Sequence, residues 1–166
     1  MPKIYTIGFS GKTKDQFMEV LDAVGVKKLI DIRLWRVARF VPWASGANLT
    51  VVLGDIRYRY IPELAPTKEL LAAYKGGMVD WAGYEKIFNN LLRERRVENL
   101  FMSTSDKRSA NSYKFARSEA SEKLFASNEW DGMCLLCSEK TADKCHRRLV
   151  AEYMAAHFPG TEIVHL

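Results

Sequence analysis

The chain has 166 residues, with 25 Lys and Arg against 20 Asp and Glu. This length suits one domain spanning residues 1–166, and 48% hydrophobic with 27% charged residues exclude a disordered chain. Three Cys argue against a secreted disulfide scaffold, and neither a signal peptide nor a membrane-spanning run is evident. We therefore expect a cytoplasmic protein without membrane contact. The net charge of +5 favours an anionic partner, either a small substrate or a nucleic acid.

Apolar patterning predicts strands that alternate with helices. Runs of β-branched and aromatic residues indicate the strands, and apolar residues three or four positions apart indicate the helices. In chain order we predict a strand at 3–8, a helix at 13–24, a strand at 28–33, a loop with a short helix at 41–54, a strand at 57–61, helices at 67–77 and 81–96, a strand at 99–103, a helix at 113–126, a strand at 133–137, a helix at 144–158 and a strand at 161–165. This order predicts an α/β domain of three layers, with a mostly parallel sheet flanked by helices.

Small, charged and thiol residues follow the carboxyl ends of the predicted strands. Ligands of open α/β sheets bind beyond that edge, so we expect one site there. Its candidate members are Ser10, Asp31, Arg33, Arg39, Glu63, Cys137, Glu139, Cys145, His146 and Arg147.

The segment that ends at Arg147 carries the most chemical information. Asp143 is predicted to cap a helix whose first turn contains Cys145 and His146. The positive end of the helix dipole and a neighbouring guanidinium lower the pKa of a thiol in such a place. We therefore predict that Cys145 is a catalytic nucleophile. The alternative is that this thiol only packs in the core.

Carboxylates and guanidinium groups complete the predicted site. Glu139 and Asp31 are the candidates for catalytic proton transfer, unless each carboxylate simply pairs with a neighbouring Arg. The residues predicted to bind the anion are Arg33, Arg39 and Arg147. Supporting roles are assigned to Cys137, His146, Ser10 and Glu63.

A metal site is the main rival interpretation of the sulfur atoms. Cys134 and Cys137 have C-x-x-C spacing, but a strand points these two positions to opposite faces. Cys137, Cys145 and His146 could supply three ligands, with a fourth from an acidic side chain. Adjacent helical residues diverge by about 100°, which disfavours this set. We predict no metal and no cofactor, and keep a structural thiol or metal site as an alternative.

Several segments resemble the family described as domain of unknown function 488. They are Ile-Tyr-Thr-Ile-Gly-Phe-Ser at 4–10, Leu-Ile-Asp-Ile-Arg at 29–33, Tyr-Ile-Pro-Glu-Leu at 60–64, Leu-Cys-Ser-Glu at 136–139 and Cys-His-Arg at 145–147. The stretch with Tyr74, Trp81 and Tyr84 resembles a subgroup with an added helical hairpin. Phe9 and Trp35 depart from the pattern, which commonly has His and Pro there.

The resemblance implies an α/β fold and a site, but it supplies no reaction. The implied site consists of Asp31, Arg33, Arg39, Cys137, Glu139, Cys145, His146 and Arg147. Together with the sulfur and charge on one sheet edge, this predicts an enzyme, a hydrolase or transferase, that acts on an anionic, phosphate-bearing substrate. The alternative is a non-catalytic nucleic-acid-binding domain.

Overall fold

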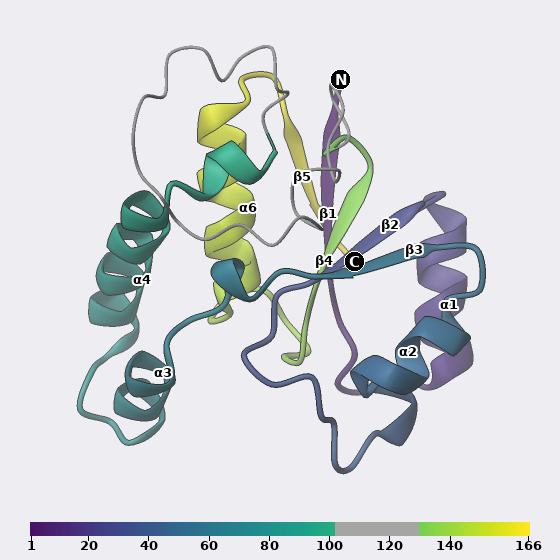
Figure 1. Cartoon of the computed structure of the whole chain (residues 1–166), viewed down its shortest axis with the longest axis horizontal. Coiled ribbons are helices and arrows are strands. Elements are labelled where there is room, and N and C mark those ends of the chain that lie inside the picture. The colour runs from purple at the N-terminus through teal and green to yellow at the C-terminus, as the bar shows by residue number, and fades with distance from the viewer. Residues whose placement is uncertain (102–129) are drawn as a thin grey trace.

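A computed structural model describes residues 1–101 and 130–166. Within them the chain forms one five-stranded sheet whose strand order is β3-β2-β4-β1-β5, and every neighbouring pair is parallel (Figure 1). The strands are β1 (Lys3–Gly8), β2 (Lys28–Asp31), β3 (Arg57–Tyr60), β4 (Met133–Cys137) and β5 (Glu162–His165). The predicted α/β fold is confirmed, and the sheet is parallel throughout.

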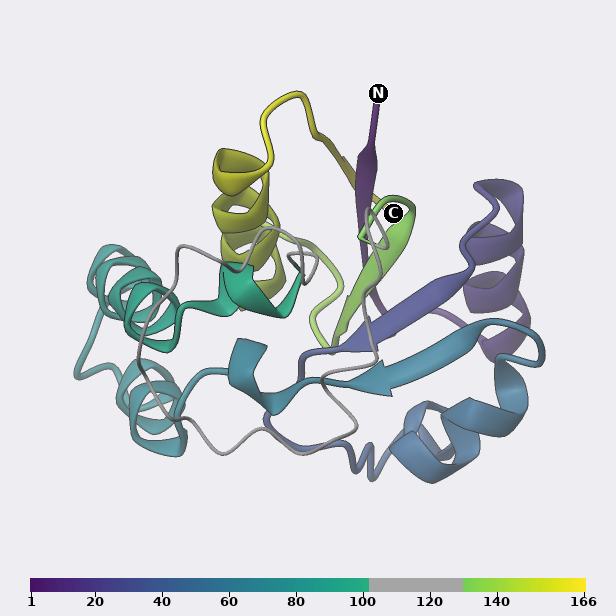
Figure 2. The same cartoon turned by 45° about the horizontal axis from the view of Figure 1, so that its top comes forward.

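Helices cover both faces of this sheet. On one face lie α1 (Lys14–Ala23) and α2 (Gly46–Val52). On the other lie α3 (Lys68–Lys75), α4 (Trp81–Arg95) and α6 (His146–His157), as Figures 1 and 2 show. The capping box of Thr13 and Gln16 starts α1, and Thr67 and Asp80 cap α3 and α4. Three short 3-10 turns complete the described elements: η1 (Pro42–Ala44), η2 (Pro62–Leu64) and η3 (Val97–Leu100).

One predicted strand is wrong, and one predicted helix lies outside the described residues. A strand was expected at 99–103, but Val97–Leu100 forms a 3-10 turn. The reason is that Arg96 ends α4 in the left-handed conformation, with φ of 49°, which turns the chain back toward the core. Phe101 is then buried as part of that turn. Residues 102–103 and the predicted helix at 113–126 are not described.

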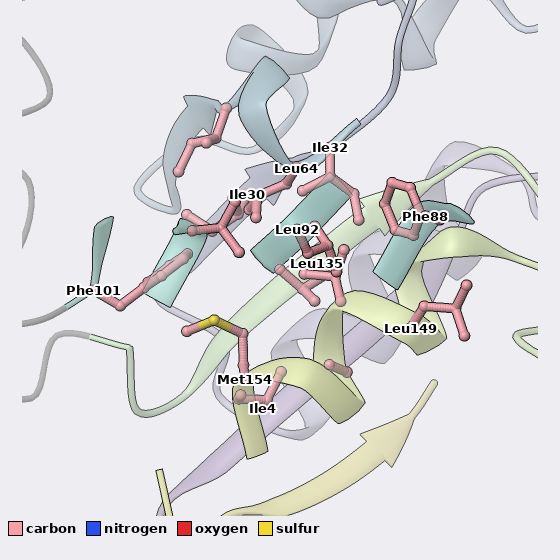
Figure 3. Packing of buried hydrophobic residues seen from close by; sticks show 14 of the residues in the cluster. Ile4, Ile30, Ile32, Leu64, Phe88, Leu92, Phe101, Leu135, Leu149 and Met154 are labelled. Atoms are coloured by element: carbon pink, nitrogen blue, oxygen red, sulfur yellow. The ribbon is translucent and has the colours of Figure 1, made fainter. Parts of the chain in front are cut away.

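The central strand β4 is buried on both faces. Its alternating side chains enter two different cores, because Leu135 packs with Ile30 toward α4 and α6, and Leu136 packs with Leu29 toward α1 and α2. Figure 3 shows the first of these cores, where Leu135 and Ile30 meet Leu92. Cys134 belongs to the second core, so the structure supports rejecting the C-x-x-C pair as a metal site.

The loop after β4 lies directly against the end of β1. A Cβ atom on Gly8 would lie 1.7 Å from the carbonyl oxygen of Glu139, so this position requires glycine. Because these neighbouring strands are parallel, the carboxyl ends of β1, β2 and β4 lie at one edge of the sheet.

Among the described residues, no helix is long and apolar enough to cross a bilayer.

Candidate functional site

A pocket of about 150 Å³ opens at this edge of the sheet. Its wall combines the end of β2, the loop after β4, the start of α6, and helices α3 and α4. The residues that line it are Arg33, Leu34, Trp35, Pro66, Leu71, Tyr74, Lys75, Trp81, Tyr84, Cys137, Ser138, Glu139, Lys144, Cys145 and His146. Five of the ten predicted site residues thus share one pocket: Arg33, Cys137, Glu139, Cys145 and His146.

Cys137, Cys145 and His146 form a compact cluster in this pocket. One donor atom from each lies within 4.8 Å of the other two, and all three residues are buried. The Sγ of Cys137 is 3.6 Å from Nδ1 of His146. The Nε2 of His146 is 2.8 Å from the carbonyl oxygen of Ile32. Because that oxygen can only accept, Nε2 carries the proton and Nδ1 keeps its lone pair beside the sulfur.

The backbone at Cys145 explains how neighbouring residues converge. Asp143 was expected to cap the helix, but Cys145 itself is the N-cap of α6, with φ −133° and ψ 137°. Cys145 is therefore extended and only His146 is helical. The objection that two successive helical residues diverge by about 100° does not apply to this pair. This cluster of two thiols and an imidazole has the donor set of a metal site.

The pKa shifts of the two thiols oppose the sequence prediction. The pKa of Cys137 is lowered, because the thiol of Cys145 donates to it, the backbone N–H groups of Ser138 and Glu139 also donate, and Arg147 is positive nearby. The pKa of Cys145 is raised, because its proton is held in the bond to Cys137 and because it is buried. The sequence predicted a lowered pKa for Cys145, but in the structure the thiol with the lowered pKa is that of Cys137.

Asp31 and Arg33 form a buried ion pair rather than a reacting pair. Nε and Nη2 of Arg33 donate to Oδ1 and Oδ2 of Asp31 at 2.8 and 2.6 Å, and Nη1 donates to the carbonyl oxygen of Ala44. Tyr58 donates its hydroxyl to Asp31 at 2.6 Å. Burial and this bond raise the pKa of Tyr58 to about 12. Both carboxylate oxygens are thus occupied, and Asp31 does not line the pocket.

Arg147 holds the loop rather than facing the pocket. Its Nη1 donates to the carbonyl oxygen of Glu139 at 2.5 Å and to Sγ of Cys145 at 3.6 Å, and Nη2 donates to the carbonyl oxygen of Lys140. Its side chain is 1% exposed. The predicted role of Arg147 as a direct anion ligand is therefore not supported, and its contacts are those of a positioning residue.

The remaining predicted site residues do not line the pocket. Arg39 is exposed, and Glu63 and Ser10 are partly buried. Ser10 contributes a backbone N–H to the carbonyl oxygen of Ser138, which ties the two loops together. The backbone carbonyl of Glu63 accepts from Arg95. These contacts support the edge of the sheet without placing the three side chains in the pocket.

A family model described as "Domain of unknown function DUF488" matches residues 13–110. The chain belongs to this family. The match includes β2, the turn with Arg33 and the helices α3 and α4, and it ends before the cysteine cluster. No curated protein and no solved structure matches this DUF488 chain.

Sequence reasoning missed the aromatic wall of this DUF488 pocket. Trp81 stacks on Tyr84 with ring centroids 5.1 Å apart, and Tyr74 packs against both rings. Trp35 and two lysines, at 75 and 144, also line the pocket. The only sequence signal was the clustering of aromatic residues in the predicted hairpin. That pattern fits a packing face equally well, since it does not show which side meets the end of the sheet.

Proposed function

We propose that this DUF488 protein is an enzyme acting on a small organic phosphate, as a hydrolase or transferase. One observation carries the proposal: the buried Cys137, Cys145 and His146 line the same pocket as cationic side chains and an aromatic wall. A cluster of nucleophilic and titratable groups inside a concave, partly apolar pocket is the usual form of an active site.

The charge of the substrate would be met by lysines rather than by the predicted arginines. Lys144 and Lys75 line the pocket, and both are exposed. An exposed ammonium can turn toward a phosphate without breaking an existing pair. Arg33, in contrast, already donates to Asp31 and to the carbonyl oxygen of Ala44. The N-terminus of the twelve-residue helix α6 lies in the same wall and adds its dipole to the attraction.

The organic part of the substrate would lie against the aromatic wall. Tyr84 is 2% exposed and is locked between Trp81 and Phe88, so this wall is rigid. A rigid apolar surface beside a charged group selects amphiphilic molecules, such as a phosphate ester with a planar ring or sugar. Glu139 is exposed and lines the pocket, which suits a group that exchanges protons with a bound substrate.

The proposal is tested by titrating the purified protein with inorganic phosphate, sugar phosphates and mononucleotides, using calorimetry. We expect at least one phosphate ester to bind, and Lys144→Glu to weaken this binding at least tenfold. Lys86→Glu is the matched control, because it makes the same charge change at an exposed position of α4 that does not line the pocket. Equal weakening by both variants, or no binding of any ester, would overturn the proposal.

Turnover of the bound ester is then measured as release of phosphate or transfer to an added acceptor. Cys137→Ser is expected to abolish turnover. Cys134→Ser is expected to retain it, because Cys134 lies on the opposite face of the same strand. Turnover that survives Cys137→Ser would remove the cluster from the reaction.

A further inference from the structure

We propose that Cys137, Cys145 and His146 bind a zinc ion whose fourth coordination position faces the pocket. This inference deepens the proposed function, because it names the reactive group of the same site.

The spacing of the donor atoms is close to that of zinc ligands. Zinc bonds of about 2.3 Å to sulfur and about 2.0–2.1 Å to nitrogen, at a tetrahedral angle, separate the two donors by about 3.5 Å. The Sγ of Cys137 and Nδ1 of His146 are 3.6 Å apart. The Sγ of Cys145 lies within 4.8 Å of the Sγ of Cys137 and of one ring nitrogen of His146. Small side-chain rotations therefore suffice to bring three ligands onto one ion.

The imidazole of His146 is fixed in the tautomer that a zinc ligand needs. A zinc-bound His normally donates its other ring N–H to a carbonyl or carboxylate, which fixes the tautomer and aims the lone pair. His146 has this arrangement, with Nε2 donating to the carbonyl oxygen of Ile32 at 2.8 Å. Phe88 packs its ring at 76° against the imidazole and prevents it from turning. Nδ1 thus keeps a free lone pair, but the Sγ of Cys137 lies 3.6 Å from Nδ1 and 3.9 Å from Nε2, beside the ring rather than along that lone pair, so a rotation of the thiol is needed to bring both donors onto one ion.

The charges and the hydrogen-bond donors around the two sulfur atoms also suit a zinc ion. Two thiolates and one neutral imidazole balance the charge of a divalent zinc ion. N–H groups stabilise the thiolates: the backbone N–H groups of Ser138 and Glu139 donate to Cys137, and Nη1 of Arg147 donates to Cys145. Soft thiolate ligands with one imidazole favour zinc over magnesium or calcium, which prefer oxygen.

The fourth position separates a catalytic zinc ion from a structural one. Structural sites have four protein ligands, and catalytic sites keep one position for water or substrate. Among the described residues, no other His, Cys, Asp or Glu joins the cluster. Asp31 is excluded as a ligand because Arg33 and Tyr58 occupy its oxygens. All three ligands line the pocket, so the open position of the ion meets the phosphate there as a Lewis acid.

Metal analysis of the full-length protein tests the site. After gel filtration in buffer without chelator, we expect about one zinc ion per chain. Cys137→Ser, Cys145→Ser and His146→Gln should each lose most of it, and Cys134→Ser should keep it. Because a variant can fail to fold, circular dichroism is recorded for each. A zinc competition titration of the chelator-treated wild-type chain gives an independent result. A wild-type chain that neither retains zinc nor takes it up at micromolar concentration overturns the inference.

Cobalt substitution tests the open position. Co²⁺ in the site should give a sulfur-to-metal charge-transfer band that is largely lost in Cys145→Ser and kept in Cys134→Ser. Added inorganic phosphate should change the visible d–d bands, and unchanged bands at saturating phosphate would overturn the open position. Zinc absent while Lys144-dependent ester binding persists would refute this inference alone. Zinc present without any ester binding would refute the proposed function alone.

Discussion

Replacing Asp31 by Asn should destabilise the protein strongly. Asp31 has no exposed surface and Arg33 is 3% exposed, so the pair is shielded from water. Asn keeps one acceptor oxygen, but its amide cannot accept from Nη2 of Arg33 or from the hydroxyl of Tyr58, which both lie 2.6 Å from Oδ2 of Asp31. Removing one partner of a buried ion pair leaves an uncompensated charge, which costs about 3–5 kcal/mol. We expect the free energy of unfolding to fall by this amount.

Urea denaturation followed by tryptophan fluorescence measures this change. Asp15→Asn is the matched control, because the same substitution at an exposed position in the first turn of α1 should cost less than about 1 kcal/mol. The double variant Asp31→Asn with Arg33→Met should recover part of the loss, because it removes the unpaired guanidinium as well. A loss below about 1 kcal/mol for Asp31→Asn, or no recovery in the double variant, would refute the buried-charge account.

Three further changes test other parts of the structure. Gly8→Ala should lower the free energy of unfolding by at least about 1–3 kcal/mol in urea denaturation, because its Cβ would overlap the carbonyl oxygen of Glu139; an unchanged midpoint would contradict this packing. Leu135→Ala should cost about 2–5 kcal/mol in the same assay, while Ile87→Ala, at a 46% exposed position, should cost clearly less. The pKa of His165 is lowered from 6.5 by burial and a nearby guanidinium, so the folded state takes up the proton less readily. Stability should therefore fall as pH drops below 6.5, and His165→Gln should flatten that dependence.

Local sequence signals predicted most of the fold. The strand ending at Gly8, the capped helix that follows it, and the wholly apolar strand at 133–137 are each marked by neighbouring residues in the chain. The strand predicted at 99–103 failed because its apolar residues pack from a turn. That turn depends on the left-handed Arg96, which no pattern in the sequence requires.

The candidate site was predicted only in part, because side-chain direction depends on register. The rule that ligands bind at strand ends predicted that Cys137 and Asp31 lie at the same edge of the sheet, and the structure has both residues there. The register pairs Asp31 with Leu136, so Asp31 shares the face of Leu136, and Cys137 points to the opposite face. The carboxylate of Asp31 therefore pairs with Arg33 away from the pocket, and the sulfur of Cys137 lines the pocket. Strand register follows from tertiary packing, so the sequence alone could not separate these roles.

The strand order explains why the pocket forms at the end of β4. The chain leaves β2 through α2 to reach β3, and it leaves the adjacent strand β4 through α6 to reach β5. Because these two crossings run in opposite directions across the sheet and parallel crossovers are right-handed, α2 and α6 cover opposite faces, as Figures 1 and 2 show. The loops that follow β2 and β4 then separate and leave the crevice that Arg33, Leu34 and Cys137 line. Cys137 is the last residue of β4 and Cys145 caps the helix that leaves it, so both sulfur atoms lie where this topology opens the sheet edge.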